Sequence, residues 1–401
     1  MKNEKPYLRI GTSYFKRVKK PLASGDFITT LIPWSAECIR IDHGRDALKD
    51  LVDCYDGFCF VPNHLNYQQK LGGFFNRYQP FHHTPRTGEP RKVFQFLDHI
   101  FGDQIDLGYD YFKILLEHPT QILPILCLVS TERSTGKTSF LHFVKSIFGD
   151  NMTINTNEDF RSNFNIEWTQ KLVIGVDETF LDRKEDSERI KNLSTAKFYK
   201  AEAKGFDRQE IEFFGKFILC SNNEDHFIIA EPSETRYWLR KIPVLKNDNN
   251  NLINELRLEI PYFIDFLLKR DYSTKKESRM WFRPDQIATP ALKRLLNQNR
   301  NKLEIEMATI LQSIIDDKDL EEIRFCVGDM QDWLIKKGVR NKDVVQIKRV
   351  LQNTWKLEPV RNSLSYTQYR YLNDGSLFEQ SGKGRYYILA KSQINELNDI
   401  H

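Results

Sequence analysis

Three nearly continuous apolar runs occupy the middle of the chain. They are LPILCLVS (123–130), KLVIGVD (171–177) and KFILCSN (216–222), and segments with helical spacing separate them. Short uninterrupted apolar runs predict strands that are buried on both faces, as in a parallel sheet covered by helices. YWLRKIPV (237–244) predicts a further strand. The pattern therefore predicts an α/β core built on a parallel sheet.

Helical spacing of apolar residues flanks this core. VFQFLDHIFG, YDYFKILLEH and NLINELRLEIPYFIDFLLKR carry apolar residues three and four positions apart, which is typical of amphipathic helices. We therefore assign residues 89–300 to one domain with helical flanks. Residues 1–88 instead alternate short apolar runs, such as FITTLIPW and GFCFVP, with turn-rich stretches. This alternation predicts a small mixed or irregular N-terminal region.

Residues 301–401 predict a separate compact unit. Helical patterns over 301–316, 327–338 and 343–355 are followed by two strand-like runs, TQYRYL and GRYYILA, with turn-forming residues between them. Helices followed by a hairpin of these two runs predict a winged helix-turn-helix domain.

Composition narrows the class of protein without assigning a function. The 401 residues include 59 Lys and Arg against 55 Asp and Glu, and the resulting net charge of +4 neither requires nor excludes a polyanionic partner. No apolar run approaches the roughly 20 residues that a membrane-spanning helix needs, and no apolar stretch follows the basic start of the chain as in a secretory signal. The six cysteines include no CxxC pair, which favours a reducing cytoplasmic compartment.

A zinc site is one alternative role for part of this cysteine set. Cys54, Cys59 and His64, followed by His82 and His83, offer five potential ligands. Their spacing is looser than in structural zinc sites, and Cys59 belongs to the apolar run GFCFV. A core role for the cysteines is the favoured interpretation.

The segment STERSTGKTSF (130–140) carries the clearest chemistry. It joins a predicted buried strand to a predicted helix. In a phosphate-binding loop, backbone N–H groups face the phosphates, the lysine reaches the β and γ oxygens, and the following hydroxyl ligates Mg²⁺. One residue departs from the consensus G-x4-G-K-[ST], because a threonine stands at the first glycine position. We expect ATP and Mg²⁺ to bind here, with nucleotide contacts from Thr131, Glu132, Arg133, Ser134, Thr135, Gly136, Lys137, Thr138 and Ser139.

Acidic and amide side chains follow the next two apolar runs. In VIGVDETF, Asp177 and Glu178 directly follow the apolar residues VIGV. The first is predicted to hold Mg²⁺ and the second to orient and deprotonate the attacking water. Asn222, with Asn223 as the alternative, is predicted to hold the γ-phosphate or that water. Further along, SETRYWLRKIP offers Arg236 and Arg240, and an arginine at this place is predicted to neutralise transition-state charge on a neighbouring subunit's nucleotide.

The order of these motifs resembles the superfamily 3 helicases. The stretch from LPILCLVSTERSTGKTSF to FFGKFILCSNNED is most similar to the primase-helicase family proteins of phages and mobile elements, which are related to virulence-associated protein E and to poxvirus-type helicases. The resemblance covers at least residues 90–245. No primase chemistry is expected, because residues 1–88 are too few for a primase domain and offer only scattered acids. Either priming is done by another protein, with a separate primase or other replication proteins as candidate partners, or the family name is inherited from longer relatives.

The resemblance implies an AAA+-type P-loop ATPase core, a homo-oligomeric ring that is usually hexameric, and ATP-driven movement on single-stranded DNA. It also implies work in the cytoplasm of a bacterial or phage-infected cell. Carried over to this sequence, the catalytic residues are Lys137, Glu178, Asn222 and Arg236, and the magnesium ligands are Thr138 and Asp177.

Two segments are candidates for holding DNA. In superfamily 3 rings a hairpin between the acidic motif and the next strand reaches the channel, and the corresponding segment here is 196–212, whose charges balance. From Trp333 to Arg349 there are six cations against Asp343 alone, so this part of the winged-helix unit is expected to contact phosphates, including those of duplex DNA. The candidate DNA-binding residues are Lys200, Lys204, Phe206, Arg208, Lys336, Lys337, Arg340, Lys348 and Arg349.

The leading hypothesis is an ATP-dependent single-stranded DNA translocase or helicase that serves replication of a phage or mobile element. The alternatives are an AAA+-type ATPase that remodels a protein partner, and a nucleotide-controlled DNA-binding regulator without motor activity. A small-molecule kinase is the most distant alternative, because no acceptor-substrate lid is evident in the sequence.

Overall fold

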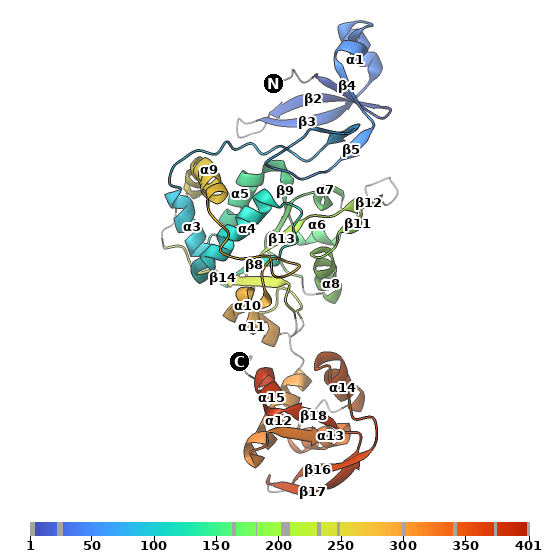
Figure 1. Ribbon diagram of the computed structural model, residues 1–401, viewed down its shortest axis with the longest axis vertical. Helices are drawn as coiled ribbons and strands as arrows, with labels where there is room; N and C mark the ends of the chain where they lie inside the picture. The colour runs from blue at the N-terminus through green and yellow to red at the C-terminus, as the bar shows by residue number, and fades with distance from the viewer. Residues whose placement is uncertain are drawn as a thin grey trace.

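The computed structural model describes residues 5–21, 27–162, 166–181, 183–201, 209–230, 234–246, 249–298, 302–339, 343–372 and 375–398. An N-terminal, a central and a C-terminal body follow one another along the long axis in Figure 1. Among the described residues, no helix combines the length and apolarity that crossing a bilayer requires.

The N-terminal body contains two small sheets. A mixed sheet has the order β3-β2-β1-β4, with α1 and α2 on one face and a three-stranded sheet, β5-β7-β6, near the other. The body is more regular than its sequence predicted, because lysines conceal the strand pattern of β2; Lys16, for example, lies 4.6 Å above the ring of Trp34. The bounds are β1 (Tyr7–Ile10), β2 (Ser13–Pro21), β3 (Phe27–Trp34), α1 (Ala36–His43), α2 (Ala47–Asp50), β4 (Val52–Tyr55), β5 (Gly57–Cys59), β6 (Lys70–Leu71) and β7 (Phe74–Asn76).

The central body is built on a five-stranded parallel sheet, which confirms the sheet predicted from the apolar runs. Its order is β14-β8-β13-β10-β9, and every neighbouring pair is parallel. All five strands therefore end at one edge, where the loops of α/β proteins commonly form binding sites. The bounds are β8 (Ile125–Val129), β9 (Met152–Asn155), β10 (Val173–Val176), β13 (Lys216–Ser221) and β14 (Tyr237–Lys241).

Helices cover both faces of this sheet, as Figure 1 shows. Alternate residues of each strand point to opposite faces, so Leu126 and Leu128 join one apolar core while Ile125 and Cys127 join the other. The first core is closed by α3 (Arg91–Phe101), α4 (Ile105–Glu117), α5 (Lys137–Phe148) and α9 (Leu252–Lys269). The second is closed mainly by α6 (Asn157–Arg161), α7 (Ile166–Thr169), α8 (Lys184–Leu193) and α11 (Pro290–Gln298), and the short α10 (Pro284–Ile287) lies beside β14.

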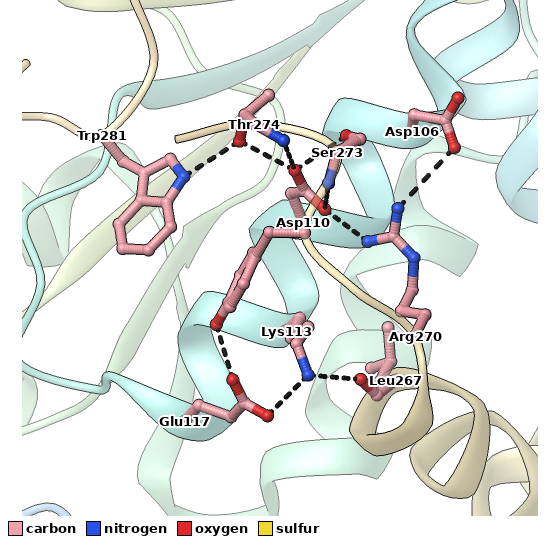
Figure 2. A network of polar contacts seen from close by, with 10 residues as sticks. Asp106, Asp110, Lys113, Glu117, Leu267, Arg270, Ser273, Thr274 and Trp281 are labelled. Atoms are coloured by element: carbon pink, nitrogen blue, oxygen red, sulfur yellow. Dashed lines mark hydrogen bonds and ion pairs between the residues drawn. The ribbon is translucent and has the colours of Figure 1, made fainter. Parts of the chain in front are cut away.

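A buried polar network fastens α4 to the segment that follows α9 (Figure 2). The fully buried carboxylate of Asp110 accepts hydrogen bonds from Arg270, from the backbone and hydroxyl of Ser273, and from the backbone and hydroxyl of Thr274. The indole of Trp281 donates to the Thr274 hydroxyl at 2.9 Å. Five donors on one carboxylate leave none of its lone pairs unsatisfied, so the network fixes the path of residues 270–281.

Replacing Asp110 by alanine is expected to lower the free energy of unfolding of the central body by about 3–5 kcal/mol, because Arg270 would lose its buried partner and the N–H groups of Ser273 and Thr274 would lose their acceptor. Asp106→Ala is the matched control, since Asp106 lies on the same helix and faces the same Arg270 at 3.7 Å but its side chain is 72% exposed. Its loss is expected to change the stability by less than about 1 kcal/mol. Denaturant unfolding followed by tryptophan fluorescence measures the stability of both variants. Equal losses of stability would contradict the structural role of the buried Asp110.

The C-terminal body contains the three predicted helices and four strands. Residues of α12, α13, α14, β15 and β18 share one apolar core. The bounds are α12 (Lys302–Lys318), β15 (Glu322–Phe325), α13 (Val327–Lys336), α14 (Val344–Arg349), a π-helical turn (Val350–Thr354), β16 (Leu364–Tyr371), β17 (Leu377–Gly384), β18 (Tyr387–Ala390) and α15 (Lys391–Asn398).

The predicted hairpin of this body is wrong in its pairing. The run TQYRYL lies in β16, which pairs with β17, whereas the run GRYYILA supplies β18, which pairs with β15. Ser381 and Gly382, two of the turn-forming residues predicted between these runs, lie within β17. In the structure Gly382 lies opposite Tyr366 in the hairpin, and a Cβ atom there would come within 3.0 Å of the tyrosine ring. The glycine therefore serves a strand rather than a turn.

Candidate functional site

The loop between β8 and α5 forms one wall of the candidate site. Its backbone takes left-handed conformations at Ser134 (φ 55°) and at Gly136 (φ 88°). A glycine is required at the second of these positions, because that conformation strains other residues and a Cβ atom would also meet the ring of Phe96 at 3.2 Å. Helix α5 begins at Lys137, so its N-terminal N–H groups face the concave side of the loop.

Lys137 lies inside this loop. Its ammonium group is within 3.0 Å of the Thr135 hydroxyl and 3.4 Å of the Ser130 carbonyl. Burial lowers the pKa of Lys137 below its usual value, since a charged ammonium is less well solvated there. A phosphate oxygen placed beside this group would restore the lost solvation, so the buried lysine suits an anionic ligand.

Two acidic residues follow β10 at the same edge. The Thr138 hydroxyl donates to the Asp177 carboxylate at 2.9 Å, which joins the loop to the strand end. Hydroxyl and carboxylate oxygens are ligands that Mg²⁺ accepts, so this pair fits a magnesium ion. Glu178 is exposed and has a left-handed backbone, with φ 50°. Such a conformation in a residue other than glycine costs about 1–3 kcal/mol and clusters at functional sites.

The end of β13 distinguishes the two candidate asparagines. The side chain of Asn223 accepts hydrogen bonds from the backbone N–H groups of Asp225 and His226 at 3.1 and 2.8 Å, so it stabilises its own loop. Asn222 is exposed and lines the same cavity as Lys137. The geometry therefore favours Asn222 as the residue that meets a ligand.

Cross-links between the strand ends hold these groups in register. The backbone N–H of Ser130 donates to the Ser221 carbonyl at 3.2 Å, and that of Thr179 donates to the Cys220 carbonyl at 2.6 Å. The hydroxyl of Ser221 also donates to the Thr179 carbonyl at 2.7 Å. The ends of β8, β10 and β13 are thus tied together directly beneath the cavity.

The cavity enclosed by these groups has a volume of about 360 Å³. Of the predicted site residues, Thr131 and Glu132 do not line it, and neither does Arg236. The structure brings the remaining predicted nucleotide, magnesium and catalytic residues to its walls, namely Arg133, Ser134, Thr135, Gly136, Lys137, Thr138, Ser139, Asp177, Glu178 and Asn222.

Glu224 does not line the cavity, but it holds the loop that does, and sequence reasoning missed it. Its buried carboxylate accepts a hydrogen bond from the backbone N–H of Thr131 at 3.1 Å and forms ion pairs with Lys241 at 3.0 Å and Arg294 at 3.2 Å. Burial alone would raise its pKa, but the hydrogen bonds from Lys241 and Thr131 outweigh this and lower it. Thr131 stands where the consensus has glycine, so Glu224 holds the loop at the residue that differs from the consensus. Within the polar run SNNED, nothing in the sequence sets this acid apart.

Replacing Glu224 by glutamine is expected to raise the KM for ATP about tenfold, which corresponds to the loss of one charge-assisted hydrogen bond. Glutamine keeps one oxygen that can accept the Thr131 N–H, but it carries no charge, so this hydrogen bond weakens and Lys241 and Arg294 lose their counter-charge. Glu132→Gln is the control, because Glu132 belongs to the same loop but is exposed and lies outside the cavity. Steady-state kinetics of both variants measure the effect. If Glu224→Gln and Glu132→Gln have the same KM for ATP, Glu224 has no role in binding the nucleotide.

Arg236 lies at the opposite edge of the sheet. Its carbonyl accepts a hydrogen bond from the N–H of Ile125, the first residue of β8, whereas the candidate cavity lies beyond the last residue of that strand. A strand of this length spans roughly 17 Å, so Arg236 cannot reach the cavity of its own chain. Its guanidinium is 3.3 Å from the carboxylate of Glu234, in a depression that Arg279 also lines.

The candidate DNA-binding residues of segment 196–212 fall partly outside the described residues. Strands β11 (Phe198–Ala201) and β12 (Gln209–Glu212) form the expected hairpin, in which exposed Lys200 lies opposite Glu210. Phe198, which is 62% exposed, is an aromatic side chain on this hairpin that sequence reasoning did not single out. Lys204, Phe206 and Arg208 lie outside the described residues.

The cations predicted in the C-terminal body lie at the ends of two helices. Lys336 and Lys337 end α13 and are exposed, and Lys337 lies 4.7 Å above the ring of Tyr371. Lys348 and Arg349 end α14 and are also exposed. Arg340 lies outside the described residues.

The potential zinc ligands have other partners or lie apart. His64 is buried, with its ring nitrogens 2.5 Å from the Tyr78 hydroxyl and 3.1 Å from the Leu116 carbonyl. Burial lowers its pKa to about 4, so the imidazole is neutral at physiological pH. Over the part of the chain that the structure describes, no group of three or more His, Cys, Asp or Glu side chains is arranged to hold a metal ion.

Comparisons with known proteins identify a shared fold. Residues 128–237 match the model of a family of unknown function, DUF5906. No curated protein sequence matches the chain. An apo structure of the NrS-1 C-terminal region matches with 13% identity and a TM-score of 0.64, covering 94% of this chain and 95% of that one. An A-form apo structure of the same region gives 17% identity and a TM-score of 0.60 over 88% and 84% of the two chains. The chain therefore shares its fold with the NrS-1 C-terminal region over nearly its whole length.

Proposed function

We propose that the chain is an ATP-dependent single-stranded DNA translocase or helicase of the superfamily 3 type. The observation that carries this proposal is the meeting of three strand ends at one cavity. The loop with buried Lys137 follows β8, the acidic pair follows β10, and Asn222 follows β13. A strand–loop–helix with a buried lysine and an adjacent hydroxyl–carboxylate pair is the arrangement that phosphoryl-transfer ATPases use.

The donor set at this cavity fits Mg²⁺ and a nucleotide triphosphate. Thr138 and Asp177, already joined at 2.9 Å, would hold the ion, which supplies charge neutralisation for the β and γ phosphates. Lys137 and the N–H groups at the start of α5 bind phosphate oxygens. Glu178 orients a water molecule and accepts its proton, and Asn222 positions that water or the γ-phosphate.

A ring of subunits is part of the proposal, because Arg236 can serve only a cavity of another chain. An arginine at the edge opposite the cavity is suitably placed if each subunit presents that edge to its neighbour's nucleotide. We propose a homo-oligomeric ring, a hexamer by resemblance, in which Arg236 leaves Glu234 and stabilises the transition state in trans. The β11–β12 hairpin and the cationic helix ends of the C-terminal body would contact DNA.

A strand-displacement assay tests the proposed motor activity. A duplex that carries a fluorescent strand and a 3′ single-stranded tail is incubated with the protein, ATP and Mg²⁺. Release of the strand is expected with the natural chain and not with Lys137→Ala, which removes the phosphate-binding ammonium. ATP hydrolysis without strand release on either 3′- or 5′-tailed duplexes would instead support remodelling of a protein partner.

A further inference from the structure

A second, larger cavity lies between the N-terminal and central bodies. Its volume is about 720 Å³, within the range of roughly 300–1,000 Å³ typical of small-molecule sites. Strands β2, β3 and β7 form one side of it, and the segments around Asn151 and around Lys171 form the other. None of its lining residues belongs to the candidate ATP site.

Specific contacts fix the two sides of this cavity relative to each other. Gln79 and Asn151 form a reciprocal pair, in which the Gln79 N–H donates to the Asn151 side chain and the Asn151 amide donates to the Gln79 carbonyl, both at 2.9 Å. The His83 ring lies 2.9 Å from the Ser146 carbonyl. These contacts join the chain just after β7 to the end of α5 and the turn that follows it, so the cavity has defined walls.

Three cations from separate elements converge on this space. Arg17 of β2 lies 5.4 Å above the Phe75 ring, and Arg77, just after β7, lies 4.8 Å from the Phe58 ring. Lys171 projects from the opposite wall and donates to the Asp150 carbonyl at 2.7 Å. No carboxylate lies within ion-pair distance of Arg77 among the described residues.

The electrostatics of the cavity favour an anionic ligand. Burial lowers the pKa of Lys171, nearby Asp150 raises it, the charge of Arg77 lowers it and Glu167 raises it, so Lys171 and Arg77 repel each other beside two partly compensating acids. Gathering like charges in a partly buried space destabilises the empty protein. A bound anion would relieve both the desolvation and the repulsion. The acidic groups on the lining, Asp150 and exposed Glu167, do not outnumber the cations.

We propose that this cavity is a second binding site, separate from the ATP site, for the phosphate groups of a nucleotide or of a short stretch of single-stranded nucleic acid. Arg17, Arg77 and Lys171 bind the phosphates. The partly buried ring of Phe60 and the guanidinium planes, which already lie against aromatic rings, provide surfaces on which a base stacks. This inference does not depend on ATP hydrolysis and stands independently of the proposed motor.

Binding without ATP tests the inference on the full chain. The probes are fluorescein-labelled (dT)4, followed by anisotropy, and unlabelled dTMP as a competitor. Arg77→Gln and Lys171→Gln are each expected to weaken (dT)4 binding about 3- to 10-fold at low salt and to reduce the slope of log K against log[salt] by about 0.7 per lost contact. Glu167→Gln removes a lining carboxylate and is expected to strengthen binding. Lys49→Gln, on α2 against the other face of the sheet, is the control.

The pattern across the variants separates the outcomes. Weaker (dT)4 binding in both cation variants, with dTMP competing poorly, identifies a strand as the ligand. Unchanged (dT)4 binding, together with direct dTMP binding measured by calorimetry that weakens in those variants, identifies a free nucleotide. If Arg77→Gln, Lys171→Gln and Glu167→Gln all bind both probes as tightly as Lys49→Gln does, the inference is overturned. The cavity is then only a gap between the N-terminal and central bodies. Because Glu167→Gln acts in the opposite direction, partial unfolding cannot imitate the expected result.

Discussion

Replacing Glu178 by glutamine is expected to lower kcat for ATP hydrolysis by a factor of about 10²–10⁴, the usual contribution of a general base. The amide keeps the shape of the side chain but cannot accept a proton from the attacking water. Glu178 is exposed at the cavity. Its backbone N–H donates to the Asp177 carboxylate at 3.0 Å, and its backbone carbonyl accepts from the Asn157 amide at 3.0 Å. Neither contact uses its carboxylate, so the substitution leaves the loop geometry intact.

ATP binding is the second readout for this variant. The affinity of Glu178→Gln for a fluorescent ATP analogue is expected to equal that of the natural chain, because Lys137, Thr138 and Asp177 are unchanged. Glu158→Gln is the matched control, since Glu158 is exposed and lies outside the cavity. Retained hydrolysis in Glu178→Gln would mean that another group activates the water.

Replacing Arg236 by alanine is expected to lower kcat by a factor of about 10³ or more, the effect of losing an arginine finger. The physical reason is its position: Arg236 lies at the edge of the sheet away from its own cavity, so in the proposed ring it would act on a neighbour's nucleotide. Arg236→Lys keeps the charge beside Glu234 and loses only the bidentate fork. The Arg236→Lys variant is expected to fold normally but to have a lowered kcat as well, so it separates an effect on catalysis from an effect on folding.

Mixing subunits tests whether this arginine acts in trans. Arg236→Ala subunits carry an intact cavity, and Glu178→Gln subunits carry an intact arginine, so mixtures of the two inactive variants are expected to regain partial hydrolysis. Arg279→Ala is the control, because exposed Arg279 lines the same depression as Arg236. Full activity of Arg236→Ala, or an equal loss in Arg279→Ala, would contradict the assignment.

The sequence identified the central sheet because its strands are apolar on both faces. LPILCLVS, KLVIGVD and KFILCSN became β8, β10 and β13, and parallel strands bring their carboxyl ends together. Lys137, Asp177 and Asn222 could therefore be placed near one another from their positions after these runs. Their roles remain predictions, but the geometry they require is present.

Features that depend on contacts between distant segments could not be predicted. Glu224 lies in a polar run, and its importance arises only where Thr131, Lys241 and Arg294 converge on it. The pairing of β16 with β17 was missed because β17 has no buried residue, so no apolar face marks it as a strand. The cations of the second cavity come from β2, from the end of β7 and from the segment before β10, and no sequence period relates them.

Steady-state ATP hydrolysis with and without single-stranded DNA is the decisive experiment for the proposed motor, with Lys137→Ala as the control. We expect hydrolysis that single-stranded DNA stimulates strongly and that Lys137→Ala abolishes in both conditions. Hydrolysis by the natural chain that is indifferent to DNA would contradict the proposed motor and favour an ATPase that remodels a protein. Absence of hydrolysis in every condition would contradict the ATPase itself and make the cavity a binding site only.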